Sequence, residues 1–408
     1  MGPFSITHVD EPAVARPAPG AAAGGPRRRL PDSYTIAGVL VFVIIVVCCW
    51  RSFVLHEEEL YFLGSRRLAD PRFLALDLTW HRLPPTSALY DHLLAPLWSF
   101  LDEFTIANLG RFLTWGLFGW SLTLLARTVR LPAWSLVVGF AVWLLWRQNL
   151  ATCGAPIEGF QVKSLSYPLM FFALTFLIRG RTAWAGAAVG LATAFHIIVG
   201  GWACLALFLC LLVNRRLYSW RQVAAFLLAA APFVAPVVVS VALFHGAQAS
   251  HAVQARIDQI YAMFAMPRCC DVTFFMSLVP GEWVRAAVIF VLAPIVVFAW
   301  PERRAALVLG TFITALIAFF IGGIVARRLE LYSLLKLYPF QLANALPALF
   351  LFVFTAAWAG TRGGRAVSDG RCGGWPWPAR CGSRTTTRWS PLRSRRRRSS
   401  WTSWAGWR

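Results

Sequence analysis

Three consecutive carboxylates, Glu57, Glu58 and Glu59, stand in the stretch SFVLHEEELYF, directly after the first long apolar run of the chain. On a helix these side chains point about 100° apart, so only one or two of them can face a given site. A carboxylate that removes the proton of an acceptor hydroxyl is a standard general base. A solvated helix start, whose carboxylates complement the helix dipole, is the alternative interpretation of each residue. We expect Glu58 or Glu59 to be catalytic, because they lie further from the apolar run, and place Glu57 in a second tier.

A second acid–base pair lies four residues apart in LALDLTWHRLPP. Asp77 and His81 would share one face of a helix or converge in a loop. We expect Asp77 to be the reserve catalytic carboxylate and His81 a second-tier partner, with a chance loop aspartate as the alternative. No Cys or His group has zinc-ligand spacing, so no metal-binding residue is predicted. A divalent cation, Mg or Mn, is the one cofactor left open as an assistant to such a base.

Lysine occurs only at Lys163 and Lys336, in a chain whose other cationic side chains are almost all arginine. Both lysines fall at predicted external positions, as do Arg327 and Arg328. Four cations facing one compartment suit the phosphate or pyrophosphate of a lipid headgroup. Snorkelling of long side chains to the membrane interface is the alternative. We expect these four residues to bind a lipid phosphate.

The elements that must position these residues are membrane helices. The chain of 408 residues is 58% hydrophobic and only 14% charged, with a mean hydropathy of +0.59, whereas a soluble domain is about a quarter charged. This composition excludes a soluble globular protein and predicts an all-α, polytopic helix bundle. Ten apolar segments would cross the membrane: 34–55, 105–126, 132–146, 165–178, 183–198, 200–213, 222–244, 285–300, 305–325 and 340–360.

Charge placement orients this bundle with a cytoplasmic N-terminus, in the inner (plasma) membrane. The arginines of the short loops then obey the positive-inside rule. Loops 56–104, 147–164, 245–284 and 326–339 come out external, and segments 87–101 and 253–264 are predicted interfacial helices. Loop 326–339 is more basic than an external loop should be, so we expect its cations to have an anionic partner.

The segments 183–198 and 200–213 are short for a membrane about 30 Å thick. They are either two spans or one broken element at Gly200-Gly201. His196, in ATAFHIIVGG, lies inside the first of them, and an intramembrane polar residue is a site hypothesis by default. We assign His196 to the second tier, with a hydrogen bond to a neighbouring helix as the alternative.

Two terminal regions lack the membrane pattern. Residues 1–33 are rich in Ala, Pro and Gly and are predicted to be a disordered cytoplasmic leader that precedes the helical domain 34–360. The tail 361–408 is rich in Arg and Trp and has no periodicity. An arm that binds anionic lipid or nucleic acid is one interpretation of this tail. We favour a frameshifted reading of a GC-rich gene, and expect membrane lipid but no nucleic acid as a partner.

The acidic stretch HEEELYF after the first span, the interfacial segment 87–101 and the cations of loops 147–164 and 326–339 resemble the GT-C class of polytopic glycosyltransferases. FQVKSLSYPLMFFAL, AFHIIVGGW and LLKLYPFQLANALP are similar to segments of uncharacterised bacterial membrane proteins of this build. The resemblance covers residues 34–360 and is architectural, and the first loop has no Asp-Asp or Asp-x-Asp pair. It implies transfer of a sugar from a polyprenyl-phosphate donor to an acceptor at the outer face.

A multi-pass transporter or lipid flippase is the alternative function class. Short helices near Gly200-Gly201 and the intramembrane His196 favour it, because transporters bind substrates at broken helices near the midplane. The position of most charges in outer loops speaks against it. We therefore expect a glycosyltransferase-like membrane protein.

Overall fold

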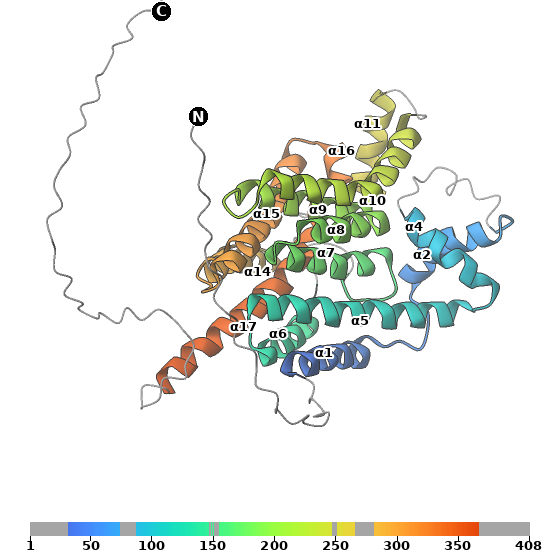
Figure 1. The fold of residues 1–408 in the computed structure, drawn as a ribbon. Coiled ribbons are helices and arrows are strands. Elements are labelled where there is room, and N and C mark those ends of the chain that lie inside the picture. The colour runs from blue at the N-terminus through green and yellow to red at the C-terminus, as the bar shows by residue number, and fades with distance from the viewer. Residues whose placement is uncertain are drawn as a thin grey trace, which may run out of the picture. The chain divides into compact units, whose positions relative to one another are not determined.

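The computed structural model describes residues 32–73, 87–146, 148, 150, 155–246, 251–265 and 281–366, and this part of the chain is all helical (Figure 1). No strand occurs among these residues. The predicted all-α bundle is therefore confirmed at the level of fold class. Asp77, His81, residues 1–31 and the tail beyond residue 366 lie outside the described residues.

Each of the ten predicted apolar segments falls on a helix. These helices are α1 Ser33–Cys49, α5 Glu103–Val129, α6 Ala133–Trp146, α7 Val162–Ile178, α8 Thr182–Phe195, α9 Ile197–Val213, α10 Trp220–Gly246, α14 Glu282–Phe298, α15 Arg303–Arg328 and α17 Ala345–Ala366. The first predicted span is too long: α1 ends at Cys49, and a short extended link leads from there to the carboxylates.

Length and composition support a membrane bundle. Among the described residues, three stretches are long and apolar enough to cross a bilayer: Trp220–Leu243, Arg303–Arg328 and Gln341–Trp358. Helices α1, α6, α7, α8 and α9 are apolar but have only 14 to 17 residues. A perpendicular crossing takes about 20 residues, so these five helices fall short of that length.

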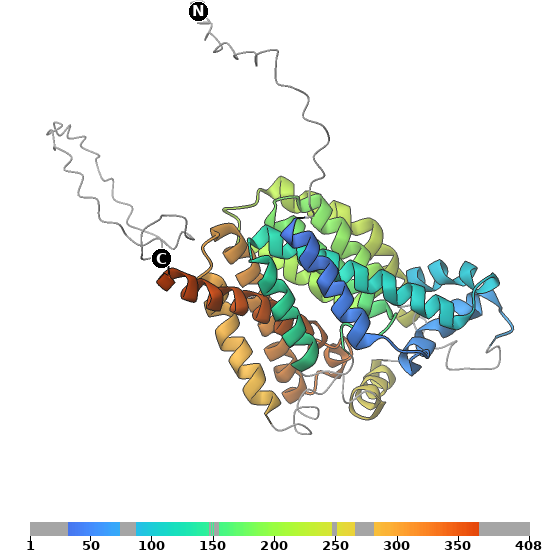
Figure 2. The ribbon, with the colours of Figure 1, turned by 90° about the horizontal axis from the view of Figure 1, so that it is seen from below.

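The ten long helices alternate in direction along the chain, so their ends meet at two ends of the bundle. At one of them, α2 (His56–Ala69) lies beside the start of α7, where Lys163 Nζ is 3.4 Å from Glu57 Oε2. The Trp202 indole, near the start of α9, donates to the Leu337 carbonyl at 2.7 Å. We call this the α2 end. Figures 1 and 2 both show α2 and α4 (Ala88–Leu94) on this side of the bundle.

The opposite end gathers the loops that were predicted to be cytoplasmic. Arg127 at the end of α5 pairs with Asp32 before α1, at 3.1 Å. The Tyr218 hydroxyl donates to the Leu177 carbonyl at the end of α7, at 2.8 Å. The Trp300 indole donates to the Val129 carbonyl, at 2.9 Å. Loops assigned to one side of the membrane thus meet at one end of the bundle.

The two segments predicted as interfacial helices are helical. Segment 87–101 forms α4 and the 3-10 helix η1 (Ala95–Ser99), which pack on α2 through the hydrogen bond from Trp98 Nε1 to Ser65 Oγ at 2.9 Å. Segment 253–264 forms α11 (His251–Ile260) and the π-helix η2 (Tyr261–Ala265). Beside α11 lies α16 (Tyr332–Leu335), and the 3-10 helix η3 (Gln341–Asn344) packs against α9 and α15. These short elements complete the α2 end.

Helices α8 and α9 are two antiparallel helices joined at the single residue His196. The start of α8 follows the end of α7 directly, and the loop after α9 returns to the same place through Tyr218 and Leu177. The open question of one broken element or two is therefore answered in favour of two helices. Their close approach depends on Gly200, where an added Cβ would lie 2.1 Å from the Thr193 backbone nitrogen.

Helix α8 also packs tightly against α10. A Cβ at Gly186 would lie 2.1 Å from the Phe226 carbonyl oxygen, and one at Gly190 would lie 2.8 Å from the Ala230 carbonyl oxygen. The spacing of four residues on both helices shows that they run parallel. Small residues four apart that let two backbones meet are typical of helix pairs in membranes.

Exposed tryptophans mark both ends of the bundle. Tryptophan prefers the membrane–water interface, where its ring is half solvated. Three exposed tryptophans lie in the first turns of helices that begin at the opposite end, namely Trp134, Trp184 and Trp220, and three lie at helix ends of the α2 end, namely Trp50, Trp146 and Trp283. Two more exposed tryptophans, Trp120 and Trp358, lie within α5 and α17, so six of these eight stand at helix ends, where a membrane interface would lie.

Candidate functional site

Glu58 is fully buried and forms an ion pair with Arg111 of α5. The Arg111 Nε donates to Glu58 Oε1 at 2.8 Å, and a second guanidinium nitrogen contacts Oε2. The backbone N–H groups of Leu55 and Phe160 donate to the same carboxylate, at 2.8 and 2.6 Å. Both oxygens are thus occupied and shielded from solvent. This geometry favours a structural role for Glu58 over the role of base that we expected.

Arg111 holds the link between α1 and α2 as well as the carboxylate. Its guanidinium donates to the carbonyls of Arg51 and Phe53, at 2.9 and 2.8 Å. The sequence reasoning missed this residue. A lone arginine inside an apolar helix, in NLGRFLTWG, was the available signal, because a buried cation needs a partner.

Glu57 is the carboxylate of the triplet whose side chain contacts the start of α7. Its Oε2 accepts from Gln161 Nε2 at 2.8 Å and lies 3.4 Å from Lys163 Nζ. The Glu57 side chain is 46% exposed, whereas that of Lys163 is 7% exposed. Among the described residues, Glu57 Oε1 makes no hydrogen bond. One oxygen is therefore held in place and the other is open to a ligand.

Glu59 points away from these groups. Its side chain is 53% exposed and lies 3.6 Å from His56 Nδ1 at the surface of α2. Among the described residues, no contact joins Glu59 to α7 or to the later loops. Glu59 therefore has the environment of a solvated helix start. The structure favours Glu57 as the base, whereas the sequence led us to prefer Glu58 or Glu59.

Tyr61 connects Glu57 with the elements that follow α10. Burial raises the pKa of Tyr61 to about 12, and the charges of Glu57 and of Tyr261 add to this effect. Tyr261 of η2 in turn contacts the hydroxyl of Tyr338, which follows α16. The acidic start of α2 and the loop 326–339 therefore lie at the same end of the bundle.

The predicted cations of loop 326–339 differ in their surroundings. Lys336 Nζ lies 3.0 Å from Asp258 Oδ1 of α11, so the expected anionic partner of this lysine is a carboxylate of the chain itself. Arg327 and Arg328 form the last turn of α15, where positive charge complements the helix dipole. Arg327 is partly buried, and Arg328 is exposed.

His196 caps α9. Its Nδ1 accepts the backbone N–H of Val199 at 3.1 Å, which satisfies one of the free donors at the start of this helix. A capping role accounts for the polar side chain at this position.

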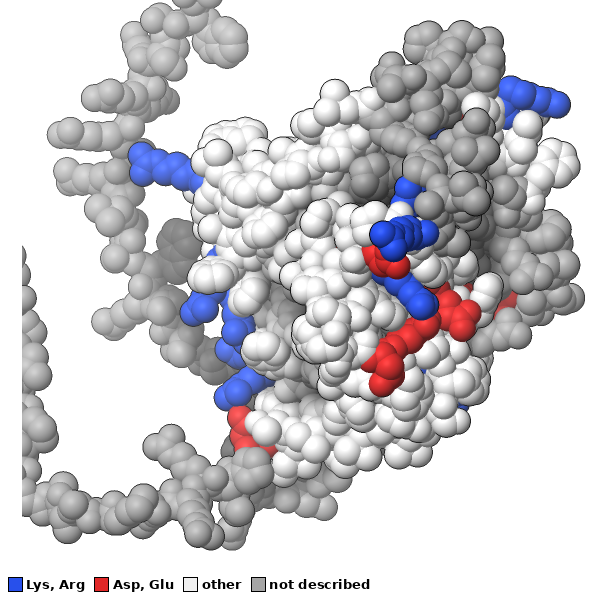
Figure 3. All heavy atoms as spheres, turned by 90° about the vertical axis from the view of Figure 1, so that its right-hand side faces the viewer, with Lys and Arg blue, Asp and Glu red and all other residues white. Residues whose placement is uncertain are grey.

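The charged side chains at the α2 end gather in one region. Figure 3 views this end and shows acidic and basic residues side by side, with uncharged surface to their left. No group of three or more His, Cys, Asp or Glu side chains that could hold a metal ion occurs in the part of the chain that the structure describes. The carboxylates and lysines of this region can take part in acid–base chemistry and in binding an anion.

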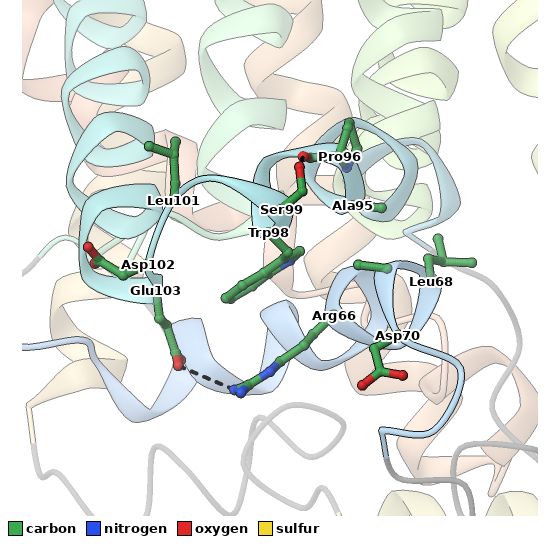
Figure 4. Close-up of a pocket in the computed structure, with 11 residues that line it drawn as sticks. Arg66, Leu68, Asp70, Ala95, Pro96, Trp98, Ser99, Leu101, Asp102 and Glu103 are labelled. Atoms are coloured by element: carbon green, nitrogen blue, oxygen red, sulfur yellow. Dashed lines mark hydrogen bonds and ion pairs between the residues drawn. The ribbon is translucent and has the colours of Figure 1, made fainter.

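An open pocket of about 730 Å³ lies on the outer side of α2. Trp98 of η1 projects into it above Arg66, which pairs with Glu103 at 3.7 Å (Figure 4). The Arg66 guanidinium also lies 4.6 Å from the centre of the Phe73 ring. Arg66 follows Glu57 by nine residues, or about 13 Å of helical rise. The residues that line the pocket belong to the last turn of α2 and to the segment 95–103, so the pocket lies at the far end of α2 from Glu57.

The chain matches no protein-family model, no curated protein and no solved structure.

Proposed function

We propose that the protein transfers a sugar from a polyprenyl-phosphate donor to an acceptor hydroxyl, with Glu57 as the general base. Glu57 removes the proton of the hydroxyl, and the acceptor oxygen forms a bond to the anomeric carbon of the sugar. The bond between that carbon and the phosphate oxygen breaks, and the phosphate keeps the electron pair. A base of this kind contributes about 10²- to 10⁴-fold to the rate.

The observation that carries this proposal is the asymmetry of the Glu57 carboxylate. Gln161 and Lys163 fix Oε2, at 2.8 and 3.4 Å, while Oε1 stays open. A base that is oriented on one oxygen and accessible on the other meets the geometric requirement for proton abstraction. Neither Glu58 nor Glu59 combines these two properties.

The cations of the site would stabilise the leaving lipid phosphate. Lys163 is one candidate because its ammonium group is buried close to the proposed base, where charge-assisted hydrogen bonds are strong. Lys336, Arg327 and Arg328 are weaker candidates, because they lie at the same end of the bundle but Lys336 is already paired with Asp258. The acceptor would approach from the pocket around Trp98.

The membrane arrangement is part of the proposal. We propose ten crossings with the α2 end outside the cell and the N-terminus in the cytoplasm. The alternation of helix directions, the tryptophans at both ends and the excess of arginine at the opposite end support it. The short helices then require tilting of neighbours or local thinning of the bilayer.

Transfer of labelled sugar tests this function. The purified protein in liposomes is given polyprenyl-phosphate donors with different sugars, and the release of free polyprenyl phosphate is measured. The proposal predicts release that depends on the protein and on an added acceptor. If no donor is consumed while the same liposomes move lipid or solute between leaflets, the transporter interpretation is the better one.

A further inference from the structure

The opposite end of the bundle carries many arginines and few carboxylates. Its described loops and helix ends hold Arg127, Arg130, Arg179, Arg181, Arg215, Arg216, Arg221, Arg303 and Arg304. Asp32 and Glu302 are the acidic residues there, and both have partners. Asp32 pairs with Arg127 at 3.1 Å, and Glu302 accepts the Ala305 N–H as the cap of α15. The remaining arginines have no carboxylate in this part of the described chain.

Arg304 lies in a site shaped by two other elements. Gly180, in the turn between α7 and α8, has a φ of +76°, and a Cβ there would lie 2.6 Å from an Arg304 guanidinium nitrogen. On another side, the guanidinium carbon is 5.5 Å from the centre of the Tyr218 ring. The Arg304 Nε is buried and has no hydrogen-bond partner.

Arg215 lies in the same loop as Tyr218. Its guanidinium carbon is 3.7 Å from the centre of the Trp220 ring, at the start of α10. One of its terminal nitrogens is buried and has no hydrogen-bond partner. Two buried guanidinium nitrogens without partners therefore occur at the same end: one belongs to Arg304, whose side chain also hydrogen-bonds to Tyr218, and the other to Arg215, in the loop that precedes Tyr218. Leaving such donors unpaired is costly, so an acceptor is expected.

The acceptor is expected to be an anion, because Arg179 and Arg181 flank Gly180, which lies next to Arg304. Arg179 donates to Thr128 Oγ1 at 2.8 Å. Burial lowers the pKa of Arg179, and the like charges of Arg181 and Arg127 lower it further. Repulsion among these arginines would be relieved by a bound phosphate, which accepts several charge-assisted hydrogen bonds from guanidinium groups.

We propose that Arg215 and Arg304 bind the phosphate of an anionic phospholipid headgroup. We assign this phosphate to a lipid because the exposed rings of Trp184 and Trp220 lie in the first turns of α8 and α10 at this end. Exposed tryptophans in a membrane protein lie at the depth of the lipid headgroups. The site lies at the opposite end from Glu57 and does not depend on glycosyl transfer.

Lipid retention by matched variants tests the site. The full chain is reconstituted with phosphatidylglycerol and phosphatidylcholine, and the retained lipid is counted by native mass spectrometry. We expect the wild type to retain phosphatidylglycerol, and the double variant R215Q/R304Q to bind it at least about tenfold more weakly. The control R216Q/R221Q removes the same charge from two exposed arginines of the same loop region and should retain the lipid.

Three outcomes would overturn the proposal: equal losses in both double variants, no preference of the wild type for phosphatidylglycerol, or full displacement of the lipid by soluble glycerol phosphate. Equal losses would mean that overall charge, and not a built site, attracts the lipid. The variant R215K/R304K guards against misfolding, since it keeps both charges and should retain more lipid than R215Q/R304Q.

Discussion

The buried ammonium group of Lys163 lies 3.4 Å from the half-exposed carboxylate of Glu57. This contact joins the start of α2 to the start of α7. It also distinguishes Glu57 from Glu58 and Glu59, which do not contact Lys163. Glu58 turns inward to Arg111, and Glu59 turns outward to solvent. The three consecutive residues thus have three environments, as their angular spacing on a helix requires.

The buried pair of Glu58 and Arg111 should dominate the stability of the α2 end. Removing one partner of a buried pair leaves an uncompensated charge and typically costs about 3–5 kcal/mol. We expect Arg111→Met to lower the unfolding midpoint in detergent strongly, and Glu58→Gln to do so through the loss of the same pair. Glu59→Gln is the matched control and should leave the midpoint unchanged. Equal midpoints for Arg111→Met and the wild type would refute the structural role.

Close packing of α8 on α10 predicts that Gly186 does not tolerate a side chain. Gly186→Ala forces a Cβ against the Phe226 carbonyl and should destabilise the protein by about 1–3 kcal/mol, the usual cost of overpacking. Gly201→Ala is the control, because an added Cβ there meets nothing within 4 Å. Thermal unfolding in one detergent compares the two variants. A Gly186→Ala protein as stable as Gly201→Ala would contradict this helix pairing.

Asp91 should make stability depend on pH. This carboxyl group is buried next to Gly64, and burial raises its pKa from 3.8 to about 6. The hydrogen bond from Ser87 lowers the pKa but does not outweigh the effect of burial. Between about pH 4 and pH 6 the unfolded chain releases this proton while the folded chain keeps it, so stability falls as the pH rises.

Asp91→Asn removes this titration. We expect the variant to match the wild type near pH 4 and to be more stable at pH 7, by up to roughly 3 kcal/mol. Unfolding midpoints across this pH range measure the difference. Parallel midpoint curves for the two proteins would show that Asp91 does not titrate in this window.

The proposed topology makes opposite predictions for two exposed serines. In a background without native cysteines, Ser333→Cys should react with a membrane-impermeant thiol reagent in intact cells, and Ser219→Cys should react only after lysis. Reaction of Ser333→Cys solely from the cytoplasm would reverse the orientation. The cations of loop 326–339 would then simply obey the positive-inside rule.

Helix positions could be predicted from the sequence because apolar length and loop charge are local properties. All ten segments proved helical, and segments 87–101 and 253–264 did too. The partners of individual charges could not be predicted, since they depend on which helices become neighbours. The pairing of Glu58 with Arg111 spans 53 positions, and that of Lys336 with Asp258 spans 78. The spacing of the triplet predicted unequal roles for its members but not which member faces α7.

The most direct test of the proposed chemistry is the turnover of lipid-linked sugar by single glutamine variants of the triplet. Glu57→Gln should lower kcat by about 10²-fold or more while the protein remains folded. Glu59→Gln should retain nearly full activity, and Glu58→Gln should lose activity only in step with its loss of folded protein. Wild-type kcat in Glu57→Gln, in an assay where the wild type transfers sugar, would contradict the assignment of Glu57 as the base.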